Sequence, residues 1–322
     1  MELKGIHHVS AITANALDNY HFYTKVLGMR LVKKTVNQDD TSMYHLFYAD
    51  EIGRPGTDLT FFEINRAGTT YRGNNSISLT SLRVQDDEAL QYWVDRFDSH
   101  SVKHNGIEEQ FGRKVIYFED KERQRLALIS DETNEGVESG IPWKQSVVPQ
   151  KYGITGLGPV RITVPNLLVT EHILVDVLKF RQMGSYLVDN HHEVFVFSTG
   201  KGGTGAEIHV EIDIDAEKER PGKGSVHHLA LRVTDRTELE QWREIISAER
   251  LPNSGIVDRY YFQSLYFRER NGILIELATD GPGFATDESI EHLGESLALP
   301  PFLENQREDI ERNLVPLYTK KD

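Results

Sequence analysis

Two tandem histidine pairs and one carboxylate are the residues of this chain with the clearest capacity for chemistry. The pairs stand in short strand-like segments, GIHHVSAIT at residues 5–13 and SVHHLALRV at residues 225–233, and a third such segment, GILIELAT, carries Glu276. Two imidazoles and one carboxylate on three strands indicate a metal site. Non-haem Fe(II) oxygenases use this donor set, because it leaves positions open for substrate and dioxygen.

The composition of the 322-residue chain narrows the class of protein. Hydrophobic residues make up 39% and charged residues 27%, which is the balance of a globular protein with a packed core. The absence of cysteine excludes disulfides, thiolate metal sites, iron–sulfur clusters and a cysteine nucleophile, so any metal is held by nitrogen and oxygen. The net charge of −14 argues against a nucleic-acid partner, since phosphate binding needs clustered lysine and arginine.

Targeting and membrane signals are not recognisable in the sequence. No segment approaches the ~20 consecutive apolar residues of a membrane span. The N-terminus, MELKGIHHVS, has the pattern of neither a signal peptide nor a transit peptide. We therefore expect a cytoplasmic protein without a membrane partner.

The chain repeats itself, and the repeat predicts the elements that position these residues. SISLTSLRV at residues 76–84 aligns with SVHHLALRV at residues 225–233, which lies 149 positions later. Each match is followed by an acidic start and by apolar residues at helical spacing with one tryptophan, in residues 86–97 and 235–246. One strand-then-helix unit is therefore used twice.

A weaker second match joins GIHHVSAIT at residues 5–13 to GLGPVRITV at residues 156–164, each again followed by an amphipathic helical pattern. All four segments continue with short runs of alternating or apolar residues, such as YHLFYAD and DLTFFEI, bounded by Gly, Asn or Asp. The pattern predicts an α+β fold of four βαβββ modules, each of roughly 65 to 80 residues.

Three parts of the chain follow from this pattern. We expect the first pair of modules in residues 1–148 and the second pair in residues 149–280, divided by the irregular stretch with proline and glycine at residues 141–153. Residues 281–322 form an acidic C-terminal tail with one short helix, ENQREDIERNL, which is expected to pack on a neighbouring element or on a dimer mate. A homo-oligomer is therefore left open.

Paired βαβββ modules around a metal are the architecture of the vicinal oxygen chelate superfamily, which includes glyoxalase I, bleomycin-resistance proteins and extradiol ring-cleaving dioxygenases. The sequence resembles this superfamily over nearly its whole length. Six segments in order are similar to the hydroquinone-cleaving dioxygenases: GIHHVSAIT, LVKKTVNQDD, YHLFYAD with GRPGTDLTFFE, SVHHLALRV, the RYYFQSLYFRE run and GILIELATD. The resemblance implies two vicinal-oxygen-chelate domains and an Fe(II) enzyme that opens a small aromatic diol, a hydroquinone or catechol, with dioxygen. Zn, Mn or Ni can replace the iron on purification.

The resemblance also implies the residues of the site. It implies three metal ligands: His8, His228 and Glu276. It implies roles beside the metal or against the substrate for four further residues: His7, His227, Arg259 and Tyr266. His227 is the leading candidate to move the phenolic proton, because histidine titrates near neutral pH. Arg259 would face developing anionic oxygen as a fixed cation, and Tyr266 would donate a hydrogen bond.

The repeat alignment adds its own evidence about the site. His228 falls opposite Leu79 and His8 falls opposite Pro159, so the two middle modules lack these donors. Only the first and fourth modules carry the metal-binding residues, and we expect these two modules to pair around the metal. If neighbouring modules paired instead, His8 could not meet Glu276.

Two further details concern the strands that carry the histidine pairs. Strict alternation places the two histidines of each pair on opposite faces of the strand. Either the partner histidine reaches round from a bulge or strand end, as the family favours, or it faces the back and only braces the ligand. In addition, Ser10 stands where the family has threonine, which preserves a hydroxyl there.

Two alternative functions remain. One is a glyoxalase-like lyase or isomerase with Ni(II) or Zn(II), in which Glu63 at the end of DLTFFE would be a fourth ligand. The other is a protein that binds a quinone or drug without turnover. The remaining histidines are expected to have no chemical role: His21, His45, His100, His104, His172, His191, His192, His209 and His292.

Overall fold

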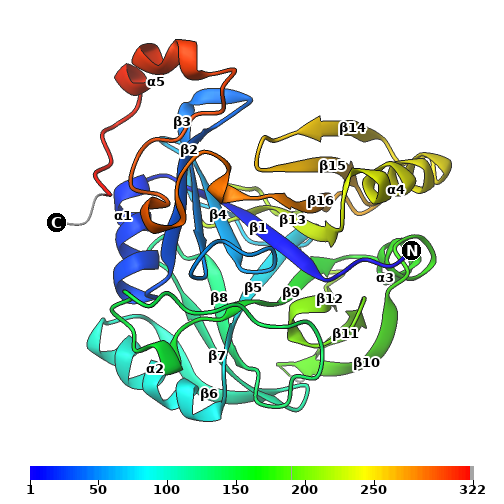
Figure 1. Ribbon diagram of the computed structural model, residues 1–322. Coiled ribbons are helices and arrows are strands. Elements are labelled where there is room, and N and C mark those ends of the chain that lie inside the picture. Colours follow the sequence, from blue (N-terminus) through cyan, green and yellow to red (C-terminus); the bar gives the residue numbers. More distant parts are fainter. Residues whose placement is uncertain (190, 320–322) are drawn as a thin grey trace.

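Two curved eight-stranded sheets form the body of the protein and lie one above the other in Figure 1. The computed structural model describes residues 1–189 and 191–319. The first sheet holds the first and last modules of the chain and is here called the outer sheet; its strand order is β14-β15-β16-β13-β1-β4-β3-β2. The second sheet holds the two middle modules and is here called the inner sheet; its order is β10-β11-β12-β9-β5-β8-β7-β6. The same strand pattern therefore occurs twice.

Each sheet takes its strands from two modules. The outer sheet contains β1 (Ile6–Thr13), β2 (Arg30–Asn37), β3 (Asp40–Ala49), β4 (Asp58–Glu63), β13 (Val226–Val233), β14 (Asn253–Asp258), β15 (Phe262–Arg268) and β16 (Leu274–Pro282). The inner sheet contains β5 (Ser76–Val84), β6 (His104–Gln110), β7 (Arg113–Glu119), β8 (Arg125–Ser130), β9 (Gly156–Val164), β10 (Arg181–Val188), β11 (His192–Ser198) and β12 (Glu207–Ile212). The predicted α+β fold of four βαβββ modules is confirmed.

The first and fourth modules share the outer sheet, joined by the antiparallel pair β1 and β13. The two middle modules share the inner sheet, joined by β5 and β9. The predicted pairing of the first module with the fourth is therefore confirmed. Each half of the chain, residues 1–148 and 149–280, gives one module to each sheet.

Helices cover the outside of the sheets (Figure 1). They are α1 (Ala16–His21), α2 (Asp87–Ser99), α3 (Leu167–Glu171), α4 (Arg236–Ala248) and α5 (Arg307–Asn313). The acidic starts of α2 and α4 are N-caps, because Asp86 and Asp235 each accept a backbone N–H three residues ahead. The repeated tryptophans, Trp93 and Trp242, are fully buried on the inward faces of these helices. No helix among the described residues is both long and apolar enough to cross a membrane.

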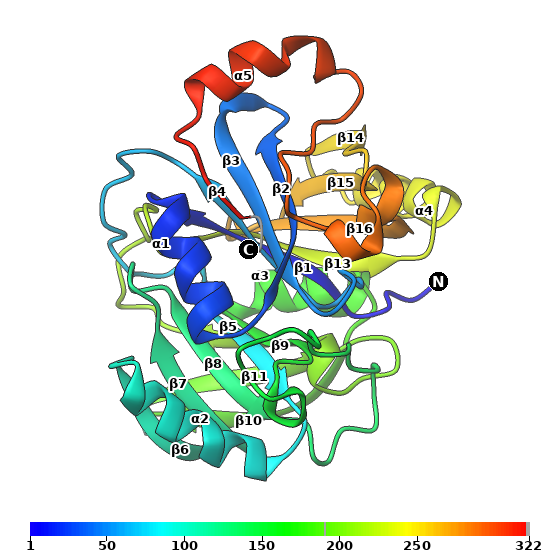
Figure 2. The same cartoon turned by 60° about the vertical axis from the view of Figure 1, so that its left-hand side comes forward.

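The C-terminal tail packs on the first module. Lys33 on β2 is fully buried and pairs with Asp287 at 2.6 Å and with Glu288 at 2.5 Å. The Ala298 amide donates to the Lys34 carbonyl, so the tail covers the edge strand of the outer sheet. Figure 2 shows α5 standing beside β3 at the top of the molecule.

A buried acid links the two sheets. The Tyr23 hydroxyl, which follows α1, donates to Asp120 Oδ2 across 3.1 Å, and Asp120 lies in the loop between β7 and β8. The backbone amides of Glu122 and Gln124 donate to Asp120 Oδ1. Burial raises the pKa of Asp120 from 3.8 to about 6, against the effect of these hydrogen bonds.

Protonated Asp120 is expected to stabilise the folded protein in mildly acidic solution. Because its folded pKa lies above its unfolded pKa, this stability is present below the unfolded pKa and is lost as the pH rises through about 6. The loss amounts to about 3 kcal/mol. Denaturant unfolding across this range should show the wild type losing about 3 kcal/mol of stability relative to Asp120→Asn, whose amide does not titrate. A difference independent of pH would contradict the prediction.

Candidate metal centre

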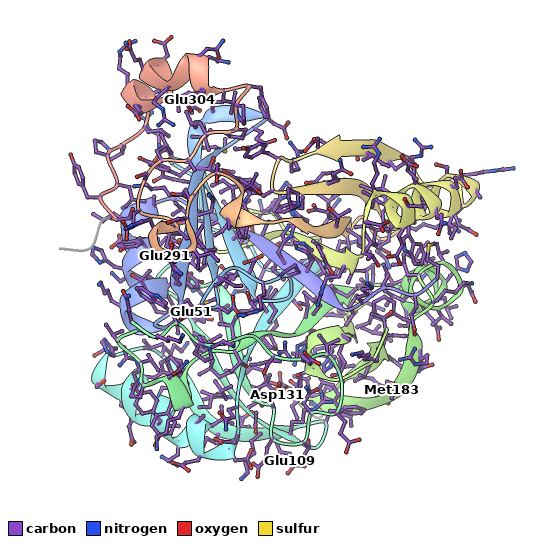
Figure 3. The ribbon with its side chains drawn as sticks, in the orientation of Figure 1. Glu51, Glu109, Asp131, Met183, Glu291 and Glu304 are labelled. Atoms are coloured by element: carbon purple, nitrogen blue, oxygen red, sulfur yellow. The ribbon has the colours of Figure 1, made fainter. Side chains whose placement is uncertain are left out.

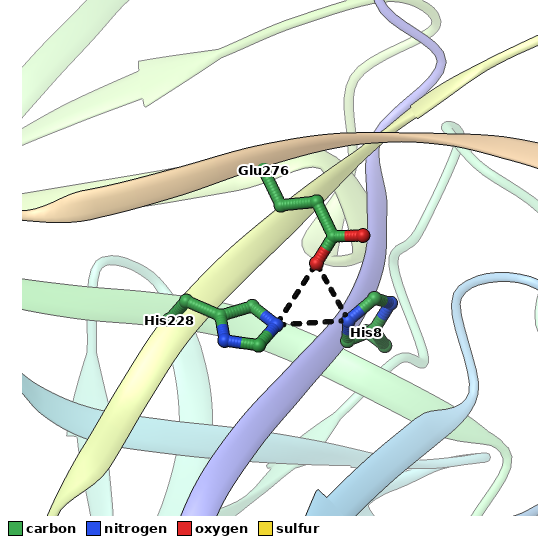
Figure 4. Close-up of side chains that lie close together, drawn as sticks. All are labelled: His8, His228 and Glu276. Carbon is green, nitrogen blue, oxygen red and sulfur yellow. Dashed lines mark hydrogen bonds and ion pairs between the residues drawn. The ribbon is translucent and has the colours of Figure 1, made fainter. Parts of the chain in front are cut away.

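Three donor atoms converge on one point of the outer sheet (Figure 4). His8 Nε2 lies 3.1 Å from His228 Nε2 and 3.1 Å from Glu276 Oε2, and His228 Nε2 lies 2.9 Å from the same oxygen. All three side chains are buried. They form a group that could hold a metal ion, as the sequence predicted.

The pairing of three neighbouring strands brings these donors together. His8 on β1 stands opposite Ala230 on β13, and Ala230 stands opposite Glu276 on β16. Side chains directly opposite one another in a sheet point to the same face, and so do residues two apart, such as His228 and Ala230. The small Ala230 therefore leaves the space between the donors free.

Two bulges place the partner histidines. One inserts His7 into β1 and the other inserts His227 into β13. A bulge sets two residues against one on the partner strand and re-aims a side chain. His7 and His227 thereby escape strict alternation and lie against the histidines that they precede. Of the two expected arrangements, the structure shows partner histidines that reach round through bulges, and in doing so they also brace the ligands.

Hydrogen bonds assign the protons of the first pair. His7 Nε2 lies 3.1 Å from the Thr279 carbonyl oxygen, which can only accept, so this nitrogen carries the proton. Burial, together with a smaller effect of the neighbouring His8, lowers the pKa of His7 to about 3, so His7 is neutral and its Nδ1 accepts. His8 Nδ1, 2.9 Å away, donates to it. The Nε2 lone pair of His8 is left facing the centre.

The second pair repeats this contact. His227 Nδ1 lies 2.8 Å from His228 Nδ1. With His228 as the donor, its Nε2 lone pair also faces the centre, and burial lowers the pKa of His228 so that the ring is neutral. Each ligand histidine is thus oriented by the histidine that precedes it, which is the role of outer partners in metal sites.

Loss of this orientation is expected to weaken metal binding. His227→Ala removes the acceptor from His228 Nδ1, and the affinity for Fe(II) should fall by about 10- to 100-fold. Competition with a chelator under anaerobic conditions measures the change. His227→Asn, which offers an amide oxygen near the same position, should recover part of it. Equal affinity in wild type and His227→Ala would contradict the assigned role.

The charges of the three donors fit a bound cation. Glu276 Oε1 accepts from the Ser264 hydroxyl, whereas Oε2 has no hydrogen-bond donor among the described residues and faces two imidazole lone pairs. A buried carboxylate that faces two further acceptors is costly unless a cation lies between them.

The spacing of the donors also fits a metal. Donors bound at about 2.1 Å and at right angles are about 3.0 Å apart, whereas tetrahedral donors are about 3.4 Å apart. The observed 2.9–3.1 Å matches the right-angled arrangement. The three residues therefore fit one face of an octahedral ion.

The two ligand histidines, His8 and His228, line a cavity of about 340 Å³. This volume suits a small aromatic molecule. Its walls come from two hairpins, β2 with β3 and β14 with β15, and from β4. Apolar side chains supply much of the wall: Ile12, Val36, Met43, Phe47, Phe62, Phe262 and Leu274.

Three of the other four predicted site residues line this cavity, whereas His7 lies behind His8 and does not line it. His227 is exposed to it, and Arg259 and Tyr266 line it together. Arg259 Nε donates to the Tyr266 hydroxyl at 3.3 Å, and its two Nη atoms lie 3.2 and 2.9 Å from Asp39. Because Asp39 belongs to the turn between β2 and β3, this ion pair closes the rim between the two hairpins.

Sequence reasoning missed His45. It was placed among the histidines without a role, yet its ring lines the cavity on β3 between Phe47 and Phe62, with centroids 4.0 and 4.1 Å away. His45 Nε2 lies 3.0 Å from Thr60 Oγ1, which lies 2.7 Å from Ser10 Oγ. The hydroxyl retained at Ser10 therefore belongs to a chain that ends on His45. The only sequence signal for this role of His45 was its spacing from Phe47, because residues two apart on a strand point to the same face.

Glu63 lies outside the donor group. Its Oε1 accepts the Ala16 amide at 2.7 Å and so binds the start of α1. Burial raises the pKa of Glu63, with a smaller opposite effect of this hydrogen bond. Among the described residues, the clustered donors are His8, His228 and Glu276 alone.

A family model supports the same conclusion. The model of the glyoxalase/bleomycin resistance protein/dioxygenase superfamily matches residues 5–128 and 76–277. The chain belongs to this superfamily. The resemblance inferred from the repeated segments is therefore confirmed.

Relatives in this superfamily match nearly the full chain. A Bacillus subtilis protein named as a candidate ring-cleaving dioxygenase, MhqA, is 51% identical over 98% of this chain and 100% of its own length. The chlorohydroquinone/hydroquinone 1,2-dioxygenase of Sphingobium indicum is 30% identical over 97% of this chain and 96% of its own. The predicted enzyme class, an oxidoreductase of the dioxygenase kind, is confirmed.

Solved structures share the fold. A candidate dioxygenase from Bacillus subtilis has a TM-score of 0.90 and 32% identity, covering 100% of this chain and 99% of its own. Glyoxalase I from Zea mays has a TM-score of 0.63 over 87% of this chain and 93% of its own, but only 12% identity. The second likeness shows the fold alone.

Proposed function

We propose that the protein is an Fe(II)-dependent extradiol-type dioxygenase that opens the ring of a hydroquinone or catechol. The observation that carries the proposal is the group of His8, His228 and Glu276, whose three donors lie 2.9–3.1 Å apart and whose two histidines line a largely apolar cavity. The names of the relatives support the substrate class. When bound, ferrous iron would hold substrate and dioxygen together and pass electrons between them.

The reaction balances without a further reductant. One carbon–carbon bond beside a hydroxylated carbon breaks, and both atoms of dioxygen enter the product. In an extradiol-type opening, the hydroxylated carbon becomes a carboxylic acid and its neighbour becomes an aldehyde or ketone. The diol supplies all the electrons that dioxygen accepts.

The chain supplies groups for proton movement and orientation. Burial lowers the pKa of His45 well below 6.5, so its imidazole is neutral and can accept the proton of a substrate hydroxyl. His227 faces the same cavity through the edge of its ring that is not bound to His228. Arg259 and Tyr266 are placed to hold an anionic oxygen. Phe62 and Phe262 line the cavity and would contact the substrate ring.

The glyoxalase-like alternative has weaker support. It needs a fourth carboxylate ligand, and Glu63 instead binds the Ala16 amide. A closed four-ligand site would also leave less room for dioxygen.

Oxygen uptake tests the proposal. The protein loaded anaerobically with Fe(II) should consume one dioxygen per ring opened with hydroquinone, chlorohydroquinone or catechol. The Zn(II)-loaded protein is the matched control, because zinc keeps the same ligands but has no redox chemistry. Turnover of a methylglyoxal–thiol adduct without oxygen uptake on any of these diols would overturn the proposal.

A further inference from the structure

The inner sheet keeps the framework of the metal site without its donors. Ala127 on β8 stands opposite Ser81 just as Glu276 stands opposite Ala230, so Ala127 replaces the carboxylate ligand. The aligned position of His228 holds Leu79. The polar pair of Arg259 and Tyr266 recurs as Gln110 and Tyr117, which are also hydrogen-bonded to each other. The inner sheet therefore repeats the strand register of the metal site but carries different side chains.

A second cavity, of about 310 Å³, opens on this sheet beside Leu79 and Tyr117. Its lining contains two carboxylates, Glu119 and Glu211. It also contains four cationic side chains: Arg72, Lys103, Arg125 and Arg161. Positive charge is therefore in excess here, in a chain whose net charge is −14 and whose acidic residues such as Glu109 and Glu304 point outward (Figure 3).

The cations of this inner-sheet cavity differ in how closely they are paired. Arg72 lies 2.7 Å from Glu119, whereas the ion pairs of Arg125 and Arg161 are longer, and Arg161 Nη2 donates to the neutral Gln110 side chain. Arg161 is 9% exposed, and its nearest carboxylate oxygen, on Glu211, lies 3.9 Å away. Its Nε has no hydrogen-bond partner among the residues that the structure describes. Arg125 lies 3.5 Å from Glu219. Burial lowers the pKa of the Arg125 guanidinium, and the charge of Arg72 lowers it further, so positive groups crowd one another.

We propose that the inner-sheet cavity binds a small organic carboxylate with an apolar or aromatic body. A guanidinium matches a carboxylate with two parallel hydrogen bonds. Leu79 and the ring of Tyr117 would cover the body of the ligand. Inorganic phosphate would satisfy the cations but leave these apolar walls uncovered.

The inner-sheet cavity would bind organic acids in preference to neutral diols. A dihydroxybenzene is uncharged at neutral pH, whereas the ring-opened acid of the proposed function carries a carboxylate. That product belongs to the class of ligand that the cavity would take. This last step rests on the proposed function, but binding of carboxylates at the inner sheet does not.

Calorimetric titration with benzoate tests the proposal on the full-length, metal-loaded protein. Benzoate should bind, whereas benzamide, which has nearly the same shape without the charge, should not. Arg125→Gln should weaken benzoate binding by about 10- to 100-fold. Lys103→Gln, at an exposed side chain whose loss does not threaten folding, should weaken it less. Arg123→Gln is the matched control, because Arg123 lies two residues before Arg125 but does not line the cavity.

Three results would overturn the proposal. Equal losses in Arg125→Gln and Arg123→Gln would show attraction to net charge alone. Loss of benzoate binding in Arg259→Gln, with none in Arg125→Gln and Lys103→Gln, would place the ligand in the outer-sheet cavity. Competition by inorganic phosphate as effective as benzoate itself would show an anion site without an organic ligand. Oxygen uptake by the Arg125 and Lys103 variants should stay at the wild-type level, so the outcome is independent of the proposed function.

Discussion

Replacing Glu276 by glutamine is expected to abolish metal binding and activity together. The substitution keeps the shape of the side chain and its contact with the Ser264 hydroxyl, but it removes the only charge among the three donors. Without that charge, two neutral imidazoles hold a divalent ion weakly. Iron content after anaerobic loading should fall from about one ion per chain to less than about a tenth, and oxygen uptake should fall by at least about 1000-fold.

Glu63→Gln provides the matched control, because it is the same chemical change in the same sheet. The Glu63 side chain binds the Ala16 amide and lies outside the donor group, so this variant should keep its iron. Melting temperature separates a ligand from a merely structural carboxylate. Metal-free Glu276→Gln should melt no lower than the metal-free wild type, because it no longer buries an uncompensated charge. Full iron content in Glu276→Gln would contradict the assignment of Glu276 as a ligand.

The pairing of the modules and the convergence of the donors could be predicted from the sequence for a physical reason. An internal repeat shows which positions are equivalent. The middle modules have Leu79 and Pro159 at the positions where the first and fourth modules have histidine. A metal site needs all its donors at one point, so the modules that keep them must share a sheet. Because the side chains of neighbouring strands share a face at matched register, His8, His228 and Glu276 then had to meet.

The features that the sequence missed, or left open between alternatives, depend on geometry that alternation does not encode. A bulge shifts the register by one residue, and no residue pattern in IHHVS or VHHLA distinguishes it from a regular strand. His45 is a single histidine in an otherwise ordinary strand, and only the curvature of the sheet brings it to the cavity. The cations of the inner-sheet cavity come from separate strands and loops, so no local sequence motif indicates this cavity.

His45→Gln is expected to retain the metal but to lower kcat by about 100- to 10,000-fold, the usual contribution of a positioned acid or base. Glutamine can keep the hydrogen bond to Thr60 but cannot accept a proton at neutral pH. Iron analysis and oxygen uptake on one preparation separate the two effects. His209→Gln, at a buried histidine of the inner sheet, is the matched control and should leave kcat unchanged.

The pH profile distinguishes a proton acceptor from a residue that only fills space. Because burial lowers the pKa of His45 below 6.5, its neutral form persists into mild acid, and kcat/KM should fall only below that pH as the ring becomes protonated. This acid limb should disappear in His45→Gln. Thr60→Val, which cuts the link from Ser10 to the ring, should lower kcat less, by about 10-fold, and shift the limb. If His45→Gln kept both the rate and the limb, proton transfer would have to pass through His227, the other imidazole exposed to the cavity.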